Sequence, residues 1–165
     1  MSPGEDENAL PEADGIKVMT TGVAEGTIVD LAGFITTVDG ERRISGYSII
    51  PGEGGHFLES YAAMNRSFYG ELLNAYTPGV TKGFGLSNIG LLMTTWGKVT
   101  EVGAGYFIIK DGAPKKLTMK VSYPSDVTPP SVGTFVKVTG INTVEPVTLY
   151  PVLRLRKPSD LWSPP

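Results

Sequence analysis

The fold is most apparent in residues 85–112, which read GLSNIGLLMTTWGKVTEVGAGYFIIKDG. Two runs rich in β-branched and aromatic residues, GLLMTTWGKVTEV and GYFIIKDG, follow one another here with glycine at their junction. Runs of this composition bounded by glycine are typical of paired β-strands. Three more runs follow, KKLTMKVSY, GTFVKVTGINTV and YPVLRLR, with the proline-rich segment PSDVTPPSV before the second of them. We therefore predict five β-strands in the C-terminal half of the chain.

A glycine pattern, G-x6-G-x2-T, occurs three times and begins at Gly26, Gly90 and Gly133. The closest pair of copies is GTIVDLAGFITTV and GTFVKVTGINTVE, in which apolar residues alternate before the second glycine. A glycine inside a strand usually marks a bulge or the sharp coil of a barrel. The repeat therefore predicts a small, strongly curved barrel built from related units.

The N-terminal part follows the order of the last three strands of the C-terminal unit. Residues 16–50 contain the short run IKVMTT, then the glycine-containing run, then the return run RRISGYSII. Asp39-Gly40 separates the last two runs, and Asp-Gly at such a position predicts a tight hairpin turn. Counterparts of the first two C-terminal strands are missing, so we predict an incomplete unit here.

The chain divides into five predicted segments. An acidic extended tail (1–15) precedes the partial β unit (16–50), and an irregular aromatic-rich connector (51–85) leads to the complete barrel (86–157) and a short C-terminal segment (158–165). In the connector, apolar residues recur at helical spacing, which favours one or two short helical turns, although a packed irregular excursion fits equally well. Trp162 is expected to anchor the C-terminal segment.

Five strands in this order, with a curled first strand and a glycine in the fourth, resemble an OB-fold, a five-stranded Greek-key barrel. Residues 85–112 resemble OB-fold modules of large exported bacterial proteins, and Met64-Asn65-Arg66 is similar to the connector before such modules. A looser similarity exists to OB-type subunits of extracellular tubular polymers. The resemblance implies an all-β protein, with an OB-fold barrel plus a partial OB-like β unit, and says little about function.

The composition excludes several classes of protein. The chain has 165 residues, no cysteine and one histidine, which excludes disulfides, zinc–thiolate sites and sites that need two imidazoles. Its apolar runs are far shorter than the ~20 residues of a membrane-spanning helix. Residues 1–15 lack the basic and apolar regions of a signal peptide. The net charge of -3 provides no basic footprint for nucleic acid.

The only histidine, His56, lies between Glu53 and Glu59 in a glycine-rich stretch. A carboxylate beside a histidine can orient a general base, but no G-x-S-x-G motif accompanies it, and we interpret His56 as a loop residue. The carboxylates do not form the spaced ladder of a calcium loop, and the glycine-rich segments lack the Lys-Ser/Thr ending of a P-loop. We expect no enzymatic activity, no catalytic residue, no metal site and no cofactor.

An incomplete barrel leaves backbone N–H and C=O groups unpaired along its edges, and such edges pair readily with other strands. Either the barrel of the same chain or a neighbouring subunit could complete it, and a head-to-tail contact between subunits repeats into filaments or rings. We expect a structural subunit that self-assembles into an extracellular or cell-surface filament or tube, with copies of itself as partners. The expected interface residues are Ile16, Val18, Ile28, Val29, Leu31, Phe34, Tyr61, Phe68, Tyr69 and Tyr76.

A ligand-binding OB module is the alternative. The binding face of an OB-fold uses its second and third strands, and aromatic residues and lysines are both present there. The negative net charge lowers the affinity for single-stranded nucleic acid. Carbohydrate stays open as the other ligand, with aromatic residues that could stack on sugar rings, namely Tyr47, Tyr61, Phe68, Tyr69 and Tyr76. The expected ligand-binding residues are Tyr106, Lys110, Lys115, Lys116 and Lys120. The expected barrel core includes Trp96, Phe107 and Val136.

Overall fold

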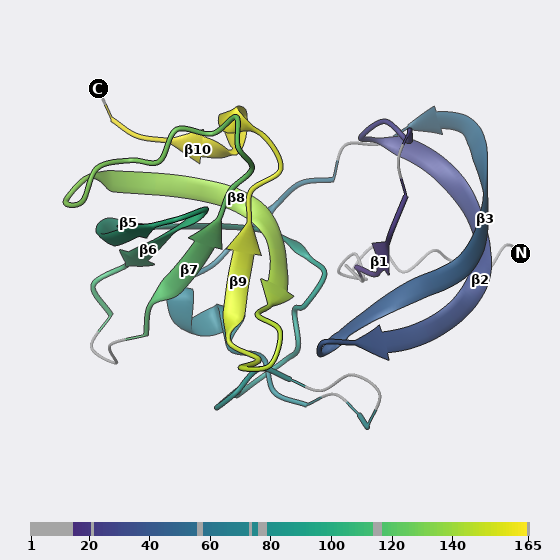
Figure 1. Ribbon diagram of the computed structural model, residues 1–165, viewed down its shortest axis with the longest axis horizontal. Coiled ribbons are helices and arrows are strands. Elements are labelled where there is room, and N and C mark those ends of the chain that lie inside the picture. The colour runs from purple at the N-terminus through teal and green to yellow at the C-terminus, as the bar shows by residue number, and fades with distance from the viewer. Residues whose placement is uncertain are drawn as a thin grey trace, which may run out of the picture.

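The structure is a computed structural model that describes residues 15–20, 22–55, 58–72, 74–75, 79–113 and 117–164. It is an all-β protein, as the sequence predicts, and these residues contain no α-helix, only two short 3-10 turns. The strands form two sheets, a closed barrel and a separate three-stranded sheet (Figure 1).

Five strands close the barrel. They are β5 (Leu92–Gly103), β6 (Tyr106–Lys110), β7 (Met119–Ser122), β8 (Phe135–Val144) and β9 (Pro151–Arg154). Their order is β5-β6-β7-β9-β8, and β8 pairs back with β5 to complete the circle. The β7–β9 pair is parallel and the other four pairs are antiparallel. This mixed, closed five-stranded barrel is consistent with an OB-like fold. Two short strands, β4 (Tyr61–Ala62) and β10 (Leu161–Trp162), extend the sheet on β5 and β8.

The separate sheet contains β1 (Lys17–Val18), β2 (Thr27–Val38) and β3 (Glu41–Gly55) in the order β1-β3-β2. β1 is parallel to β3 and β2 is antiparallel to it, which is the arrangement of β7, β9 and β8 in the barrel. The hairpin turns at Asp39 and Gly40, whose φ angles of 54° and 79° match the predicted tight turn. β3 runs five residues past the expected end at Ile50, because its glycine-rich end continues to pair back to Thr27.

The three glycine motifs have a common structure. The first glycine of each has a positive φ, at Gly26 (86°), Gly90 (95°) and Gly133 (95°). A side chain at the second glycine would collide with the neighbouring strand, at Gly33, Gly97 and Gly140. The close approach of the strands at these points is what the sharp curvature of a small barrel requires.

The hydrophobic core lies inside the barrel. Alternate residues point inward, so that Phe107 and Val136 are completely buried, as expected. Trp96 was expected in the core, but it is 36% exposed because it lies between the inward-facing Thr95 and Gly97 on β5. The alternation of β5 therefore places this indole on the outer surface.

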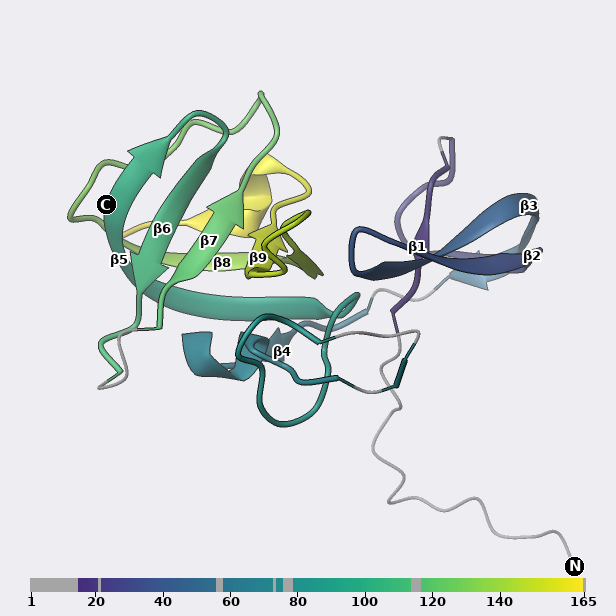
Figure 2. The ribbon, with the colours of Figure 1, turned by 60° about the horizontal axis from the view of Figure 1, so that its bottom comes forward.

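One end of the barrel is closed by the 3-10 turn η1 (Asn65–Phe68), which Figure 2 shows against the barrel below β5. Phe68 is completely buried in the barrel core, and Tyr69 is 7% exposed with its hydroxyl donating to the Thr118 carbonyl (3.1 Å). Both residues were expected to contact a neighbouring subunit. That expectation is wrong, because both side chains face the barrel. The predicted short helical turn in the connector is thus present, and it acts as a plug.

Asn65 holds this plug in place. Its backbone N–H donates to Asp111 Oδ2 (2.8 Å) and its side-chain amide donates to the Ile109 carbonyl (3.3 Å). Its Oδ1 accepts a hydrogen bond from the hydroxyl of Thr95 (2.9 Å). Because Asn65 has no exposed surface, these bonds take the place of hydrogen bonds to water. The turn is therefore fixed to both β5 and the end of β6.

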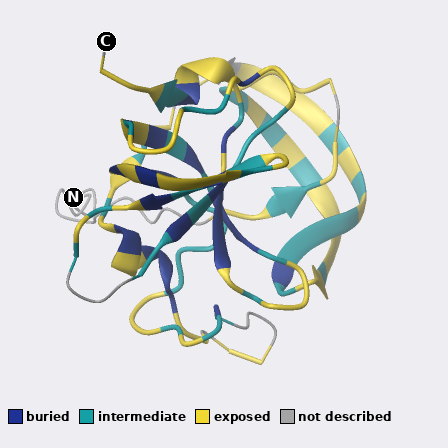
Figure 3. Ribbon diagram, turned by 60° about the vertical axis from the view of Figure 1, so that its left-hand side comes forward, coloured by how far each residue is buried: buried dark blue, intermediate teal, exposed yellow. Residues whose placement is uncertain are grey.

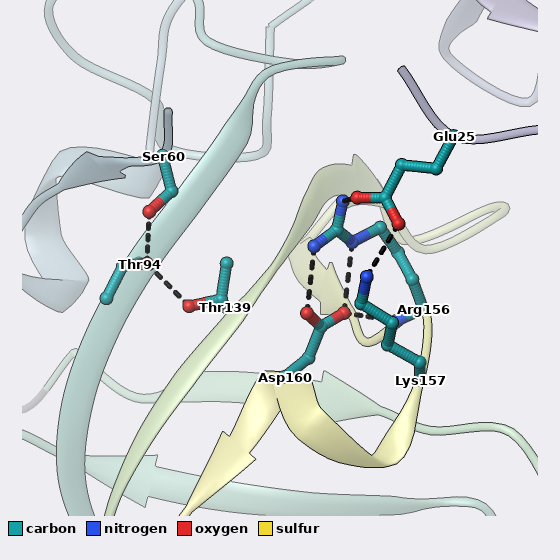
Figure 4. A network of polar contacts seen from close by, with 7 residues as sticks. All are labelled: Glu25, Ser60, Thr94, Thr139, Arg156, Lys157 and Asp160. Atoms are coloured by element: carbon teal, nitrogen blue, oxygen red, sulfur yellow. Dashed lines mark hydrogen bonds and ion pairs between the residues drawn. The ribbon is translucent and has the colours of Figure 1, made fainter. Parts of the chain in front are cut away.

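The second 3-10 turn, η2 (Pro158–Asp160), is organised around an ion network (Figure 4). The Asp160 carboxylate accepts hydrogen bonds from Arg156 Nε (3.0 Å), Nη2 (2.8 Å) and the backbone N–H (2.9 Å). Burial alone would raise the pKa of Asp160, but the hydrogen bonds and charge of Arg156 outweigh it and lower that pKa. Glu25, just before β2, binds Arg156 (2.5 Å) and Lys157 (2.6 Å). These ion pairs connect the three-stranded sheet to the barrel.

Candidate assembly surface

The outer edge of β2 has no strand partner among the described residues. β2 pairs with β3 along Thr27–Val38, and no second strand of the described chain pairs with it. The corresponding barrel strand, β8, has β5 as its second partner. Edge strands of soluble proteins are usually short or protected by lysine or proline. β2 is 12 residues long, and its sequence TIVDLAGFITTV contains no lysine, no proline and one charged residue, Asp30.

Both faces of this sheet carry large apolar side chains. Directly opposite residues share a face, so that Leu31 and Ile49 lie together on one side, and both are half-buried. Phe34 (75% exposed) and Ile50 (64% exposed) lie on the other side. None of the buried hydrophobic residues of the described chain belongs to this sheet, whereas the barrel strands alternate between buried and exposed (Figure 3). The sheet therefore has no core of its own.

Phe34 has a defined position on this sheet. It lies beside a bulge in β3, where the register shifts between Ala32 and Phe34 and Gly46 has a φ of 57°. A Cβ on Gly46 would be 3.5 Å from the Phe34 ring, so the ring covers the glycine across the strands. An aromatic ring over a glycine supports the sheet at a point without a side chain. The other side of the ring stays open to solvent.

A cavity of about 520 Å³ separates the three-stranded sheet from the barrel. It is lined by residues 15–20 and 40–42 from the N-terminal part, and by residues including Ile141, Thr143 and Arg154 from the barrel. The Lys17–Glu41 ion pair (2.5 Å) is on this lining. Gly40, at the hairpin turn, packs closely on Leu149 of the barrel. The sheet thus touches the barrel but shares no strand pairing with it among the described residues.

The expected interface residues fall into three groups. Ile16, Ile28, Phe34 and Tyr61 are exposed, while Val18, Val29 and Leu31 are half-buried. Phe68 is in the barrel core, Tyr69 is in a second buried cluster with Val80 and Val144, and Tyr76 lies outside the described residues. All the residues of the first two groups except Tyr61 lie on or beside the three-stranded sheet. The structure therefore concentrates the accessible candidates on one element.

The alternative ligand-binding residues are only partly brought together. Lys120 Nζ lies 4.6 Å from the centre of the Tyr106 ring, but Lys110 is at the far end of β6. Tyr106 and Lys120 each have an acidic partner. The Tyr106 hydroxyl donates to Glu101 (2.8 Å), and Lys120 forms an ion pair with Glu145. The hydrogen bond to Glu101 raises the pKa of Tyr106, and the bond from Lys120 lowers the pKa of Glu145. Lys115 and Lys116 lie outside the described residues.

The histidine and groups of possible metal ligands are the remaining candidates from the sequence. His56 lies outside it. The described residues contain no group of three or more His, Cys, Asp or Glu side chains that could hold a metal ion. No helix within these ranges is long and apolar enough to cross a membrane.

A surface feature that the sequence reasoning missed is the outward placement of both tryptophans, Trp96 and Trp162. The repeat contained the signal. In the two motifs of the barrel, the residue before the second glycine, Trp96 or Thr139, is on the outer side of its strand, since the buried glycine occupies the inward side at the next position. Once the glycine is known to face inward, the alternation of the strand places Trp96 outside the barrel.

No protein-family model and no curated protein matches the chain. The fold and the surfaces described above are therefore the basis for assigning a function. They define a β-rich protein with a closed, five-stranded, OB-like barrel and a separate sheet that has an open edge.

Proposed function

We propose that the protein is a non-enzymatic structural subunit that self-assembles outside the cell into a filament or tube through β-rich contacts. The single observation that supports this proposal best is that, among the described residues, the 12-residue strand β2 pairs with one strand only, in a sheet without buried apolar residues. Isolated hairpins are marginally stable in water. A neighbouring chain that adds a strand there would pair the backbone and cover the apolar faces.

The barrel indicates how such a strand would run. In the barrel, β8 pairs with β5 in antiparallel orientation along Phe135–Ile141. β2 corresponds to β8, because both contain the glycine motif and both form an antiparallel pair with the strand that follows, β3 or β9. We therefore propose that the incoming strand is antiparallel to β2. When the donating and accepting surfaces differ, each added copy presents a new accepting edge, and the chain of contacts continues unless the rotation closes a ring.

The exposed apolar side chains supply the driving force. Burying a large side chain such as Phe34 or Ile50 contributes roughly 1.5–3 kcal/mol, and these two start at 75% and 64% exposure. Association costs about 4–15 kcal/mol in lost freedom of motion. Several such residues, together with strand pairing, are therefore needed, which is consistent with a contact that uses the length of β2.

Sedimentation velocity over a concentration series tests the proposal. We expect the intact chain to form larger species as the concentration rises, and Phe34→Lys to remain a monomer, because a charge on an edge strand opposes pairing. Leu86→Lys is the matched control, since Leu86 is an 88% exposed loop residue away from β2. Equal association of the two variants would exclude β2 as the assembly surface.

A further inference from the structure

Both tryptophans of the chain lie in one row across three strands. Lys137 on β8 is directly opposite Trp96 on β5, and on its other side it is directly opposite Trp162 on β10. Directly opposite residues of antiparallel strands point to the same face. The residues next to Lys137 and Trp162 in the sequence point the other way: Val138 is in the barrel core, and Leu161 packs against that core. The row Trp96–Lys137–Trp162 is thus on the outer surface of the barrel.

Two further rows flank it. On one side Lys98 is opposite Phe135, and Phe135 is 48% exposed. On the other side Thr94 is opposite Thr139, and their hydroxyls are 2.7 Å apart. The Thr94 hydroxyl is also 2.7 Å from that of Ser60, which Figure 4 shows as a chain of three hydroxyls. Thr94 is only 9% exposed, so the accessible surface consists mainly of exposed aromatic rings and amines.

We propose that this aromatic platform, made of Trp96, Phe135, Lys137 and Trp162, binds an extended polysaccharide. Trp96 and Trp162 are 36% and 52% exposed. They are separated by one intervening strand, so their backbones are about 10 Å apart. Sugar rings have flat C–H faces that stack on indole rings, and a linear glycan repeats such faces at regular intervals. Lys137, between the rings, donates hydrogen bonds to the ring and hydroxyl oxygens of the sugar.

The centre of the platform distinguishes a glycan from a protein partner. The centres of protein interfaces are depleted in lysine, whereas here a lysine lies between the two tryptophans. Aromatic rings with lysines are also the elements of a single-stranded nucleic acid site. The net charge of -3 opposes binding of a polyanion but not of a neutral polysaccharide. The combination favours a glycan.

The platform is independent of the proposed assembly surface. It lies on β5, β8 and β10 of the barrel, at the left of Figure 1, whereas the three-stranded sheet lies at the right. It also differs from the β6–β7 surface with Tyr106 and Lys120, on which the acidic residues already occupy the polar groups. A subunit can therefore use β2 for its own copies and the barrel for a polysaccharide.

The test is a depletion assay with the full chain on insoluble cellulose and insoluble chitin. We expect the chain to bind at least one of them, and Trp96→Ala or Trp162→Ala to weaken binding by about tenfold or more, since an aromatic stacking contact is of that strength. Trp96→Tyr and Trp162→Tyr keep a ring and should retain most of the binding. Phe84→Ala is the matched control, because Phe84 is 47% exposed and lies outside the platform.

Oligo-dT and the oligomeric state are measured on the same variants. Absence of binding to both polysaccharides, or unchanged binding by both alanine variants, would overturn the proposal. Tight binding of oligo-dT that depends on the two tryptophans would assign the platform to nucleic acid instead. Loss of self-association in the alanine variants, with unchanged polysaccharide binding, would assign it to contacts between subunits. Circular dichroism spectra equal to wild type establish that each variant is folded.

Discussion

Phe68 distinguishes a barrel plug from a subunit contact, because the two roles predict opposite effects of Phe68→Ala. The side chain has no exposed surface and packs in the core with Met93 and Val99. Removing a buried phenylalanine costs about 3–5 kcal/mol, as the sum of lost transfer energy and the cavity that is left. The cavity cannot easily collapse, since Asn65 fixes the turn to β5 and β6. We therefore expect a loss of about 4 kcal/mol.

The assay is urea unfolding followed by tryptophan fluorescence, at a concentration low enough for the chain to be monomeric. With a denaturant slope of about 2 kcal/mol per M, a loss of about 4 kcal/mol lowers the midpoint by about 2 M. Phe34→Ala serves as the comparison. Because Phe34 is 75% exposed on the open sheet, its removal should change barrel stability by less than about 0.5 kcal/mol.

The refuting results are specific. A Phe68→Ala variant within about 1 kcal/mol of wild type would show that the side chain is not part of the core, since buried phenylalanines do not behave in this way. A midpoint lowered equally by Phe34→Ala would show that the open sheet is packed in solution. Loss of self-association without loss of stability in Phe68→Ala would restore its expected contact role.

Two further predictions concern the buried polar groups. Asn65→Ala should destabilise the chain by about 1–3 kcal/mol, because the Thr95 hydroxyl loses its acceptor; combining it with Thr95→Val should recover part of that loss in the same urea assay. Asp160→Asn should cost about 1–3 kcal/mol at neutral pH. The pKa of Asp160 is lower in the folded chain than in the unfolded one, so its contribution is present above the unfolded pKa and is lost as the pH falls through the folded value. Thermal unfolding between pH 7 and 2 should therefore show a flatter acid decline below about pH 4 for Asp160→Asn than for wild type; parallel curves would contradict the assignment.

The sequence predicted the strands well where a glycine motif began them. The turn at Asp39-Gly40 and the strand runs of the barrel follow directly from local patterns, because positive φ and alternating apolar residues leave a strong local signal. The two-residue strands β4 and β10 were not predicted, because they are set by pairing with β5 and β8 and do not lie in apolar, β-branched runs.

The site residues were harder to predict, because exposure depends on which side of a curved strand a residue occupies. Trp96 was expected in the barrel core and lies on its outer surface, whereas Phe68 was expected at a subunit interface and lies in the core. Aromatic residues occur in cores and at contact surfaces alike, so composition did not separate the two roles. Phe68 lies in a glycine-flanked, irregular connector, where no period indicates which side chains face the barrel.

The most direct measurement of the proposed function is electron microscopy of the purified chain over a concentration series, with light scattering on the same samples. We expect filaments, tubes or closed rings that become more abundant with concentration, because each free β2 edge accepts another copy. Particles that remain uniform at 17.6 kDa at every concentration would contradict the proposal, since the open sheet would then be stable without a neighbour.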